Sequence, residues 1–353
     1  YHGGNALQGV VEGTLPVGLA VLWSVLAGAA VRQPPVIHNG IVVAVNAQGE
    51  VFALTTAGKE LWRRKLKAPD PAIEEGRDVY IEAPIMTCRE KVVVGTDMGD
   101  VVALNINTGE AYWWANIEGP VRGAPNYSDD GSKFFVINQD MGSLICLDAN
   151  SGKTLWQSTA PDRSDASPAV ANDVAVYGSC ASALHVIDLN SGSHLQDIAI
   201  EEGGGQIAGG VALVDGFAYA GVRDGRVLCA DIKAGKIKWM TSVSELEVFC
   251  TPAVNEDWVI VTDYDGRIHG LNRETGEIKW QQELKDTPSS PIIVGNKIVV
   301  SDDGVLYLLR LEDGVHVRQH KIADAITSPS VVEGMILLGT EDGTITALGA
   351  GSQ

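Results

Sequence analysis

Repeated Asp-Gly strings are the feature of this sequence that most suggests chemistry, because carboxylates at alternating positions can bind calcium. Asp263-Tyr264-Asp265-Gly266 is one such string. An EF-hand loop places a bidentate Glu six residues after its glycine, and this chain has Asn272 at that position. We therefore predict that these strings are hairpin turns, and we expect no bound calcium.

Histidines are the next candidates, because two imidazoles on one face of an element can share a metal ion. Neither an HxH nor an HExxH motif occurs. His316 and His320 share one face of a predicted strand, but four residues of extended chain separate them by about 13 Å. The spacing predicts no metal site among His2, His38, His185, His194, His269, His316 and His320.

The cysteines do not form a recognisable reactive or metal-binding motif. No CxxC pair occurs, which disfavours a zinc cluster, a thioredoxin-type site and c-type haem attachment. Cys180 has no histidine beside it in the sequence, so a catalytic thiol is not favoured. A disulfide between Cys229 and Cys250 and buried free thiols both remain open, with free thiols favoured. The full set is Cys88, Cys146, Cys180, Cys229 and Cys250.

The overall charge excludes one class of partner. The chain has 26 Lys and Arg against 45 Asp and Glu, a formal net charge of -19 over 353 residues. Such a surface repels phosphate backbones, so we expect no nucleic-acid partner.

The elements that would position any site come from an internal repeat. A small residue and a proline precede an apolar strand, a polar-glycine turn and a second strand, and a later glycine is followed four positions on by tryptophan. This period of about 40 residues is typical of propellers. We predict an all-β fold, one eight-bladed β-propeller of four-stranded antiparallel blades over residues 1–353. The expected blades are about 35–66, 84–116, 124–159, 167–200, 209–242, 251–284, 290–322, and 328–349 with 20–27.

The recurrent tryptophans favour a structural role. One large apolar wedge on each outer strand would fill the gap between neighbouring blades. The fourth and seventh repeats have Gln196 and Arg318 instead. The predicted wedges are Trp23, Trp62, Trp113, Trp156, Trp239 and Trp280.

The apolar run 15–31 resembles a signal peptide or a short membrane span, but it lacks a preceding basic residue and contains Pro16 and Gly18. Trp23 lies 12 residues before Pro35, as Trp113 lies 12 before Pro125. We therefore predict that residues 21–26 form the outer strand of the last blade and close the ring, and we expect no transmembrane segment.

One connection between repeats is longer than the others. From Trp62 to Pro84 it spans 22 residues, about ten more than elsewhere, and it is rich in charge. We predict a rim loop that is either a recognition site or a tolerated insertion. Its candidate docking residues are Asp70, Glu74, Glu75 and Asp78.

These repeats carry a family resemblance. Residues 99–113 read GDVVALNINTGEAYW, which is similar to the GxLxALDxxTGxxxW signature of the pyrroloquinoline-quinone (PQQ) type propeller repeat. In length and in number of repeats the chain most resembles the BamB-like periplasmic propellers. The quinoprotein dehydrogenases of this repeat class are much longer, and many carry adjacent cysteines, which are absent here. PQQ and calcium are therefore not expected as cofactors.

The resemblance implies a non-catalytic scaffold of the bacterial cell envelope, located in the periplasm or at the outer membrane, that docks other envelope proteins through its rim loops. It also implies a docking stretch at 242–249, where the candidates are Glu245, Glu247 and Phe249. A lipid anchor remains open. The alternatives are a small-molecule-binding or quinoprotein-like enzyme that uses the central funnel, and a cofactor-free subunit of a larger redox or surface assembly.

Overall fold

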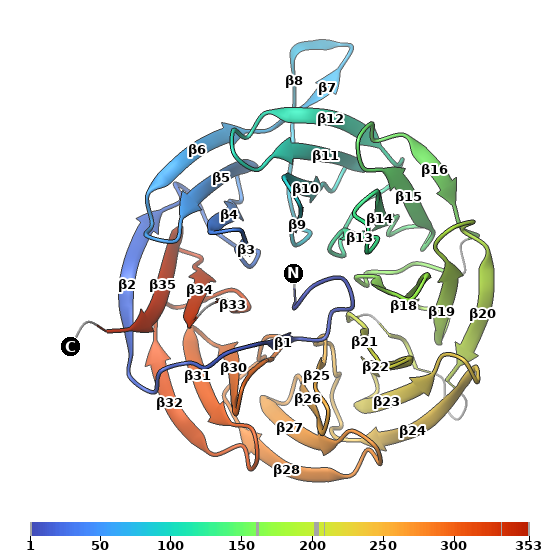
Figure 1. Cartoon of the computed structure of the whole chain (residues 1–353), viewed down its shortest axis with the longest axis vertical. Coiled ribbons are helices and arrows are strands. Elements are labelled where there is room, and N and C mark those ends of the chain that lie inside the picture. Colours follow the sequence, from blue (N-terminus) through green and yellow to red (C-terminus); the bar gives the residue numbers. More distant parts are fainter. Residues whose placement is uncertain (1, 160–161, 201–204, 208, 333, 352–353) are drawn as a thin grey trace.

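The protein is a closed ring of eight β-sheets around a central axis (Figure 1). The computed structural model describes residues 2–159, 162–200, 205–207, 209–332 and 334–351. Each sheet is a blade of four antiparallel strands, and one blade gains a fifth strand from the N-terminal segment. The predicted eight-bladed propeller is confirmed.

The strands of each blade follow one another outward from the axis. Blade 1 has β3 (Val36–His38), β4 (Ile41–Val45), β5 (Glu50–Thr55) and β6 (Glu60–Lys65); blade 2 has β9 (Met86–Cys88), β10 (Lys91–Gly95), β11 (Asp100–Asn105) and β12 (Ala111–Asn116); blade 3 has β13 (Asn126–Tyr127), β14 (Lys133–Ile137), β15 (Leu144–Asp148) and β16 (Thr154–Gln157); blade 4 has β17 (Ala169–Ala171), β18 (Val174–Gly178), β19 (Ala183–Asp188) and β20 (His194–Ala199).

The second half of the ring repeats this order. Blade 5 has β21 (Ala212–Val214), β22 (Phe217–Gly221), β23 (Arg226–Asp231) and β24 (Lys236–Ser242); blade 6 has β25 (Ala253–Val254), β26 (Trp258–Thr262), β27 (Arg267–Asn272) and β28 (Ile278–Glu283); blade 7 has β29 (Ile292–Val294), β30 (Lys297–Asp302), β31 (Val305–Arg310) and β32 (His316–Lys321); blade 8 has β33 (Ser330–Val332), β34 (Met335–Gly339), β35 (Thr344–Ala350) and β2 (Leu19–Leu26).

The two middle strands of each blade are buried on both faces. In β10 and β11 the valines and alanines pair directly, for example Val93 with Ala103, and both are fully buried. These residues are apolar on both sides of the strand because each blade packs between two neighbours. The core is therefore a series of layers between adjacent blades.

Each of the six predicted wedge tryptophans packs on the following blade, on the glycine of that blade's outer turn. The Trp62 indole lies on Gly109 and donates a hydrogen bond from Nε1 to the Ile106 carbonyl at 2.8 Å. Gly109 has a φ of +72°, and a Cβ there would lie 2.4 Å from the indole. The same indole-on-glycine joint is formed by Trp23 with Gly58, Trp113 with Gly152, Trp156 with Gly192, Trp239 with Gly276 and Trp280 with Gly314. Trp156 makes the contact alone, since its Nε1 has no hydrogen-bond partner among the described residues.

Gln196 takes over the joint where the fourth repeat lacks tryptophan. Its amide nitrogen donates to the Ile232 carbonyl at 2.5 Å, and its side chain lies over Gly235. An amide group thus reproduces the indole hydrogen bond with less apolar contact.

The ring closes through the N-terminal strand, as predicted. β2 pairs antiparallel with β35, from Leu19 opposite Ala350 to Leu26 opposite Thr344. Trp23 Nε1 donates to the Thr56 carbonyl of blade 1 at 2.7 Å. The apolar run is therefore a strand, and within the described residues no helix has the length and apolarity needed to cross a membrane.

The glycine of a joint can be tested against a glycine of similar conformation in open space. We expect Gly109→Ala to lower the free energy of unfolding by about 2–4 kcal/mol, because strained backbone and overpacking against Trp62 add together. Gly216 has a φ of +81° with nothing within 4 Å of a Cβ, so Gly216→Ala should cost only about 1 kcal/mol. Urea denaturation measures both, and equal losses would contradict the joint.

Candidate interaction site

The connections between blades lie on one rim of the ring, which we call the connection rim. After β6 the chain bonds the β4–β5 turn, from Leu66 N to the Gly49 carbonyl at 3.0 Å. After β24 it bonds the β22–β23 turn in the same way, from Val243 N to the Gly225 carbonyl at 2.9 Å. Both sequence-predicted docking segments therefore face the same side of the propeller.

The predicted rim loop after blade 1 is a β-hairpin, which corrects the sequence-based expectation. β7 (Lys67–Asp70) pairs antiparallel with β8 (Ile73–Asp78). Figure 1 shows the hairpin projecting outward from the circumference between β6 and β12. The sequence did not predict these strands because it is charged and contains proline, and because Ala68 is the one residue of the two strands that is buried in the core.

The base of the hairpin is fastened to blade 2. The Arg77 guanidinium pairs with the Asp100 carboxylate, whose side chain is only 7% exposed, and Asn116 donates to the other oxygen of Asp100 at 2.9 Å. Lys67 Nζ pairs with Asp78 Oδ1 across the two strands at 2.8 Å. Charge-assisted bonds of this kind hold the hairpin in a defined direction.

The four acidic candidates of the hairpin have different surroundings. Asp70 accepts the backbone N–H of Ala72 at 2.8 Å and so shapes the turn. The hydrogen bond from Lys67 lowers the pKa of Asp78, which makes that residue part of the base. Glu74 and Glu75 are exposed on β8, and no described residue forms an ion pair with them. These two glutamates are the acids best placed to meet a partner.

A hollow of about 330 Å³ adjoins the hairpin on the connection rim. Tyr80 follows β8 directly, is 58% exposed and lines the hollow. Gln33 closes one side by donating to the Glu82 carbonyl at 2.7 Å. The wall is completed by Arg32, Val45, Asn46, Ala47 and Ile81. The hairpin, the exposed tyrosine and the hollow together form a continuous surface.

The second candidate segment lies between blades 5 and 6. Phe249 stacks near Tyr264, with ring centroids 5.9 Å apart, and the Arg223 guanidinium lies 5.5 Å from the Phe249 ring centroid. Arg223 also approaches Glu247 at 3.4 Å, whereas Glu245 is exposed. An arginine between an aromatic ring and a carboxylate is a common composition at protein interfaces.

The structure does not bring the two candidate segments together. One lies between blades 1 and 2 and the other between blades 5 and 6, so four of the eight blades separate them in either direction. They lie on opposite sides of the ring, and a partner that contacted both would have to span the rim (Figure 1).

The N-terminal segment enters the middle of the ring, which the sequence did not reveal (Figure 1). Its carbonyls accept backbone N–H groups from the innermost strands of successive blades, and β1 (Val10–Val11) adds to β29 in parallel. The bonds are Val170 N to Asn5 O, Leu213 N to Ala6 O, Val254 N to Gln8 O and Ile293 N to Gly9 O, at 2.8–2.9 Å. The segment thus satisfies inner edges that would otherwise be open.

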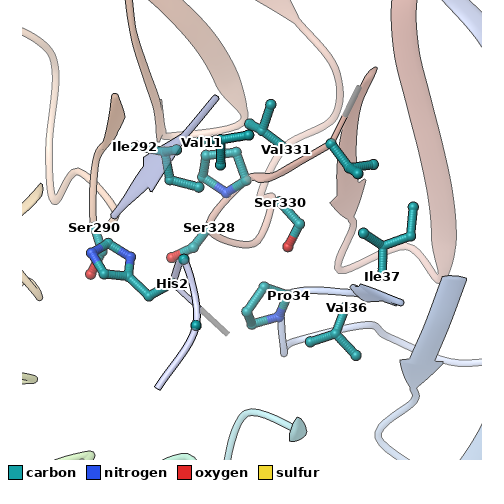
Figure 2. Close-up of a pocket in the computed structure, with 14 residues that line it drawn as sticks. His2, Val11, Pro34, Val36, Ile37, Ser290, Ile292, Ser328, Ser330 and Val331 are labelled. Carbon is teal, nitrogen blue, oxygen red and sulfur yellow. The ribbon is translucent and has the colours of Figure 1, made fainter. Parts of the chain in front are cut away.

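A pocket of about 260 Å³ remains beside this segment, between it and the inner strands of blades 7, 8 and 1 (Figure 2). None of its described lining residues carries a carboxylate, an ammonium or a guanidinium group. PQQ carries carboxylates, and calcium prefers oxygen ligands that include carboxylates, so this pocket does not fit either. Its labelled lining residues are His2, Val11, Pro34, Val36, Ile37, Ser290, Ile292, Ser328, Ser330 and Val331.

The cysteines are free thiols, and Cys229 and Cys250 do not pair. Burial raises the pKa of Cys146 to about 12 and the pKa values of Cys229 and Cys250 to about 11. These thiols are protonated at neutral pH and act as small apolar side chains.

Comparisons with known proteins agree with this architecture. The family model described as "Outer membrane protein assembly factor BamB" matches residues 58–206 and 201–328. The chain belongs to the BamB family.

Curated relatives of the family cover nearly the whole chain. The outer membrane protein assembly factor BamB of Salmonella typhimurium is 28% identical over 93% of this chain and 88% of its own length. That of Xanthomonas campestris is 30% identical over 92% and 84%. Both alignments therefore extend far beyond a single shared repeat.

Solved structures show the same fold. BamB from Moraxella catarrhalis superposes with a TM-score of 0.79 at 22% identity, covering 95% of this chain and 99% of that chain. Quinohemoprotein alcohol dehydrogenase from Comamonas testosteroni has a TM-score of 0.80 at 13% identity, over 99% and 80%. A BamB-family scaffold and a dehydrogenase can therefore share this propeller, and the fold alone does not decide activity.

The anchoring of the hairpin is testable by proteolysis. We expect Arg77→Ala to increase the rate at which a Glu-specific protease cuts after Glu74 or Glu75 by about tenfold or more, because a charge-assisted bond contributes about 2 kcal/mol. Arg64→Ala on the neighbouring strand is the control and should leave the rate unchanged. Equal rates in both variants and the original chain would show that Arg77 does not hold the hairpin.

The docking of the N-terminal segment should depend on pH. Burial lowers the pKa of His2 to about 4, so the docked segment favours neutral imidazole. The free energy that neutral His2 contributes to docking is fully present above the ordinary histidine pKa of about 6.5. It falls as the pH drops toward 4, with a loss of about 2 kcal/mol at pH 5. Hydrogen exchange of residues 2–11, corrected for intrinsic rates, should show this loss. His2→Gln should abolish the pH dependence, and unchanged protection of the original chain at pH 5 would contradict the assignment.

Proposed function

We propose that this protein is a scaffold in the assembly of outer-membrane proteins and that it docks other envelope proteins through its connection rim. The observation that carries the proposal is family membership over the propeller, since the curated relatives are named as outer membrane protein assembly factors. By the same resemblance we place it in the periplasm, associated with the outer membrane.

The connection rim supports the scaffold role. It carries the anchored hairpin with two exposed glutamates, and the exposed Tyr80 lies beside a hollow. Tyrosine and arginine are enriched where proteins bind one another, and a rigid hairpin loses little entropy on binding. We propose the hairpin side as the primary docking surface and the Phe249 cluster as a second one.

We propose that the protein is not an enzyme and holds no PQQ. The N-terminal segment crosses the inner strands of blades 4–7, and the remaining channel pocket has no charged group among its described lining residues. A quinoprotein would need cationic groups for the cofactor carboxylates and carboxylates for calcium.

The experiment is purification of the tagged chain from membrane and soluble fractions of its host, with mass spectrometry of the intact complex and of any bound small molecule. We expect outer-membrane assembly proteins to copurify without quinone. Recovery of a monomer with stoichiometric quinone would overturn the proposal and favour the enzyme alternative.

The docking surface has its own test. We expect the double variant Glu74→Lys and Glu75→Lys to reduce copurification of the partner at least tenfold. The substitutions reverse two negative charges, and the new positive charges would repel the positive partner groups that complement the glutamates. Glu110→Lys, an exposed acid in the turn on the opposite rim, is the matched control and should retain the partner. Loss in the control, or full retention in the double variant, would move the interface elsewhere.

A further inference from the structure

Blade 4 carries a group of two imidazoles and one carboxylate on its outer strands. His185 Nδ1 lies 2.6 Å from Asp197 Oδ1, and His194 Nε2 lies 2.7 Å from the same oxygen. The three ligand atoms lie within 4.8 Å of one another. His185 is buried, whereas the side chains of His194 and Asp197 are 31% and 46% exposed. Three potential metal ligands thus converge at a point that solvent can reach.

A β-bulge causes this convergence. His185 lies directly opposite Asp197 across β19 and β20, and the register then shifts so that Ile187 pairs with His194. The extra residue, Leu195, turns His194 to the same face as Asp197, although regular alternation would place positions three apart on opposite faces. The sequence search for HxH and HExxH spacing missed this group because it depends on strand pairing and on the bulge.

The same bulge occurs in every blade. The other blades therefore show which residues occupy the positions equivalent to His185, His194 and Asp197. In blade 1 it brings Glu60 and Arg63 into an ion pair at 2.8 Å, which confirms that the geometry places these positions in contact. Only blade 4 has metal-ligating types at all three positions among blades 1–7. The others have Phe52, Glu60 and Arg63; Val102, Ala111 and Trp114; Ile145, Thr154 and Gln157; Leu228, Ile237 and Met240; His269, Ile278 and Gln281; and Tyr307, His316 and Gln319.

Ser179 holds the buried imidazole from behind. Its Oγ lies 2.6 Å from His185 Nε2 and also accepts the N–H of Ala181 at 3.0 Å. In most metal sites a carboxylate, a backbone carbonyl or a water accepts the second ring N–H of a ligating histidine and fixes the ring orientation, and here the Ser179 hydroxyl is in that place. A serine nucleophile is not supported, because Ser179 is 1% exposed and no substrate could reach it.

We propose that His185 Nδ1, His194 Nε2 and Asp197 Oδ1 bind a divalent transition-metal ion, with Zn²⁺ as the expected ion and water as the fourth ligand. Two nitrogens and one carboxylate oxygen suit Zn²⁺, whereas Ca²⁺ and Mg²⁺ prefer all-oxygen sets. Binding replaces the two hydrogen bonds to Asp197. Each ring then carries its proton on the other nitrogen, and for His185 this proton is donated to Ser179 Oγ.

Calorimetric titration of the full chain with Zn²⁺ tests the proposal, and Co²⁺ absorption reports the coordination. We expect one equivalent to bind, and His194→Ala and Asp197→Asn each to weaken binding at least tenfold. His316→Ala is the matched control, because His316 occupies the same bulge position in blade 7 beside Tyr307. Ser179→Ala should weaken binding about tenfold by freeing the His185 ring.

The exposed ligands keep the test independent of folding, since His194 and Asp197 lie outside the core and circular dichroism can verify each variant. Absence of Zn²⁺ binding to the original chain would overturn the proposal. Undiminished binding in both His194→Ala and Asp197→Asn, or an equal loss in His316→Ala, would overturn it as well by placing the ion elsewhere.

Discussion

The contact between an outer-strand indole and the turn glycine of the next blade is the interaction on which this propeller depends. No blade can bury both of its apolar faces alone, so each needs a neighbour on either side. The indole fixes the spacing between neighbours through its flat contact and its hydrogen bond, as Trp62 does with Gly109. The joints run from blade 8 through blade 1 to blade 7, and the one between blades 8 and 1, formed by Trp23 on Gly58, is supplied by the N-terminal end of the chain.

The joints fix the ring, and the connections between blades and the central axis lie outside these joints. The connections between blades can lengthen without disturbing the core, and one of them has become the β7–β8 hairpin, held in place by Arg77. At the axis, by contrast, the N-terminal segment forms hydrogen bonds with the inner edges of four blades. The molecule therefore presents a hairpin at its rim and, at its centre, an N-terminal segment that is bonded to four blades and leaves a pocket of about 260 Å³ beside it.

Repetition also creates equivalent positions that can diverge one blade at a time. The bulge on the outer strand pair serves packing or an ion pair in most blades, yet in blade 4 it gathers His185, His194 and Asp197. Such a group adds chemistry without altering the joint, which Gln196 on the same strand maintains. A site of this kind is detectable only when blades are compared position by position in space.

The sequence by itself determined the propeller, the number of blades and the closing strand. The period, the turn glycines and the spacing from tryptophan to proline, as from Trp23 to Pro35, are local signals that recur along the chain. Only the tertiary structure decided that each tryptophan meets the glycine of the next blade, that residues 67–78 pair as a hairpin, that the N-terminal segment occupies the axis and that two histidines converge on one aspartate. These features join residues through strand pairing, bulges and ring closure, which place distant positions in contact without leaving a periodic trace along the chain.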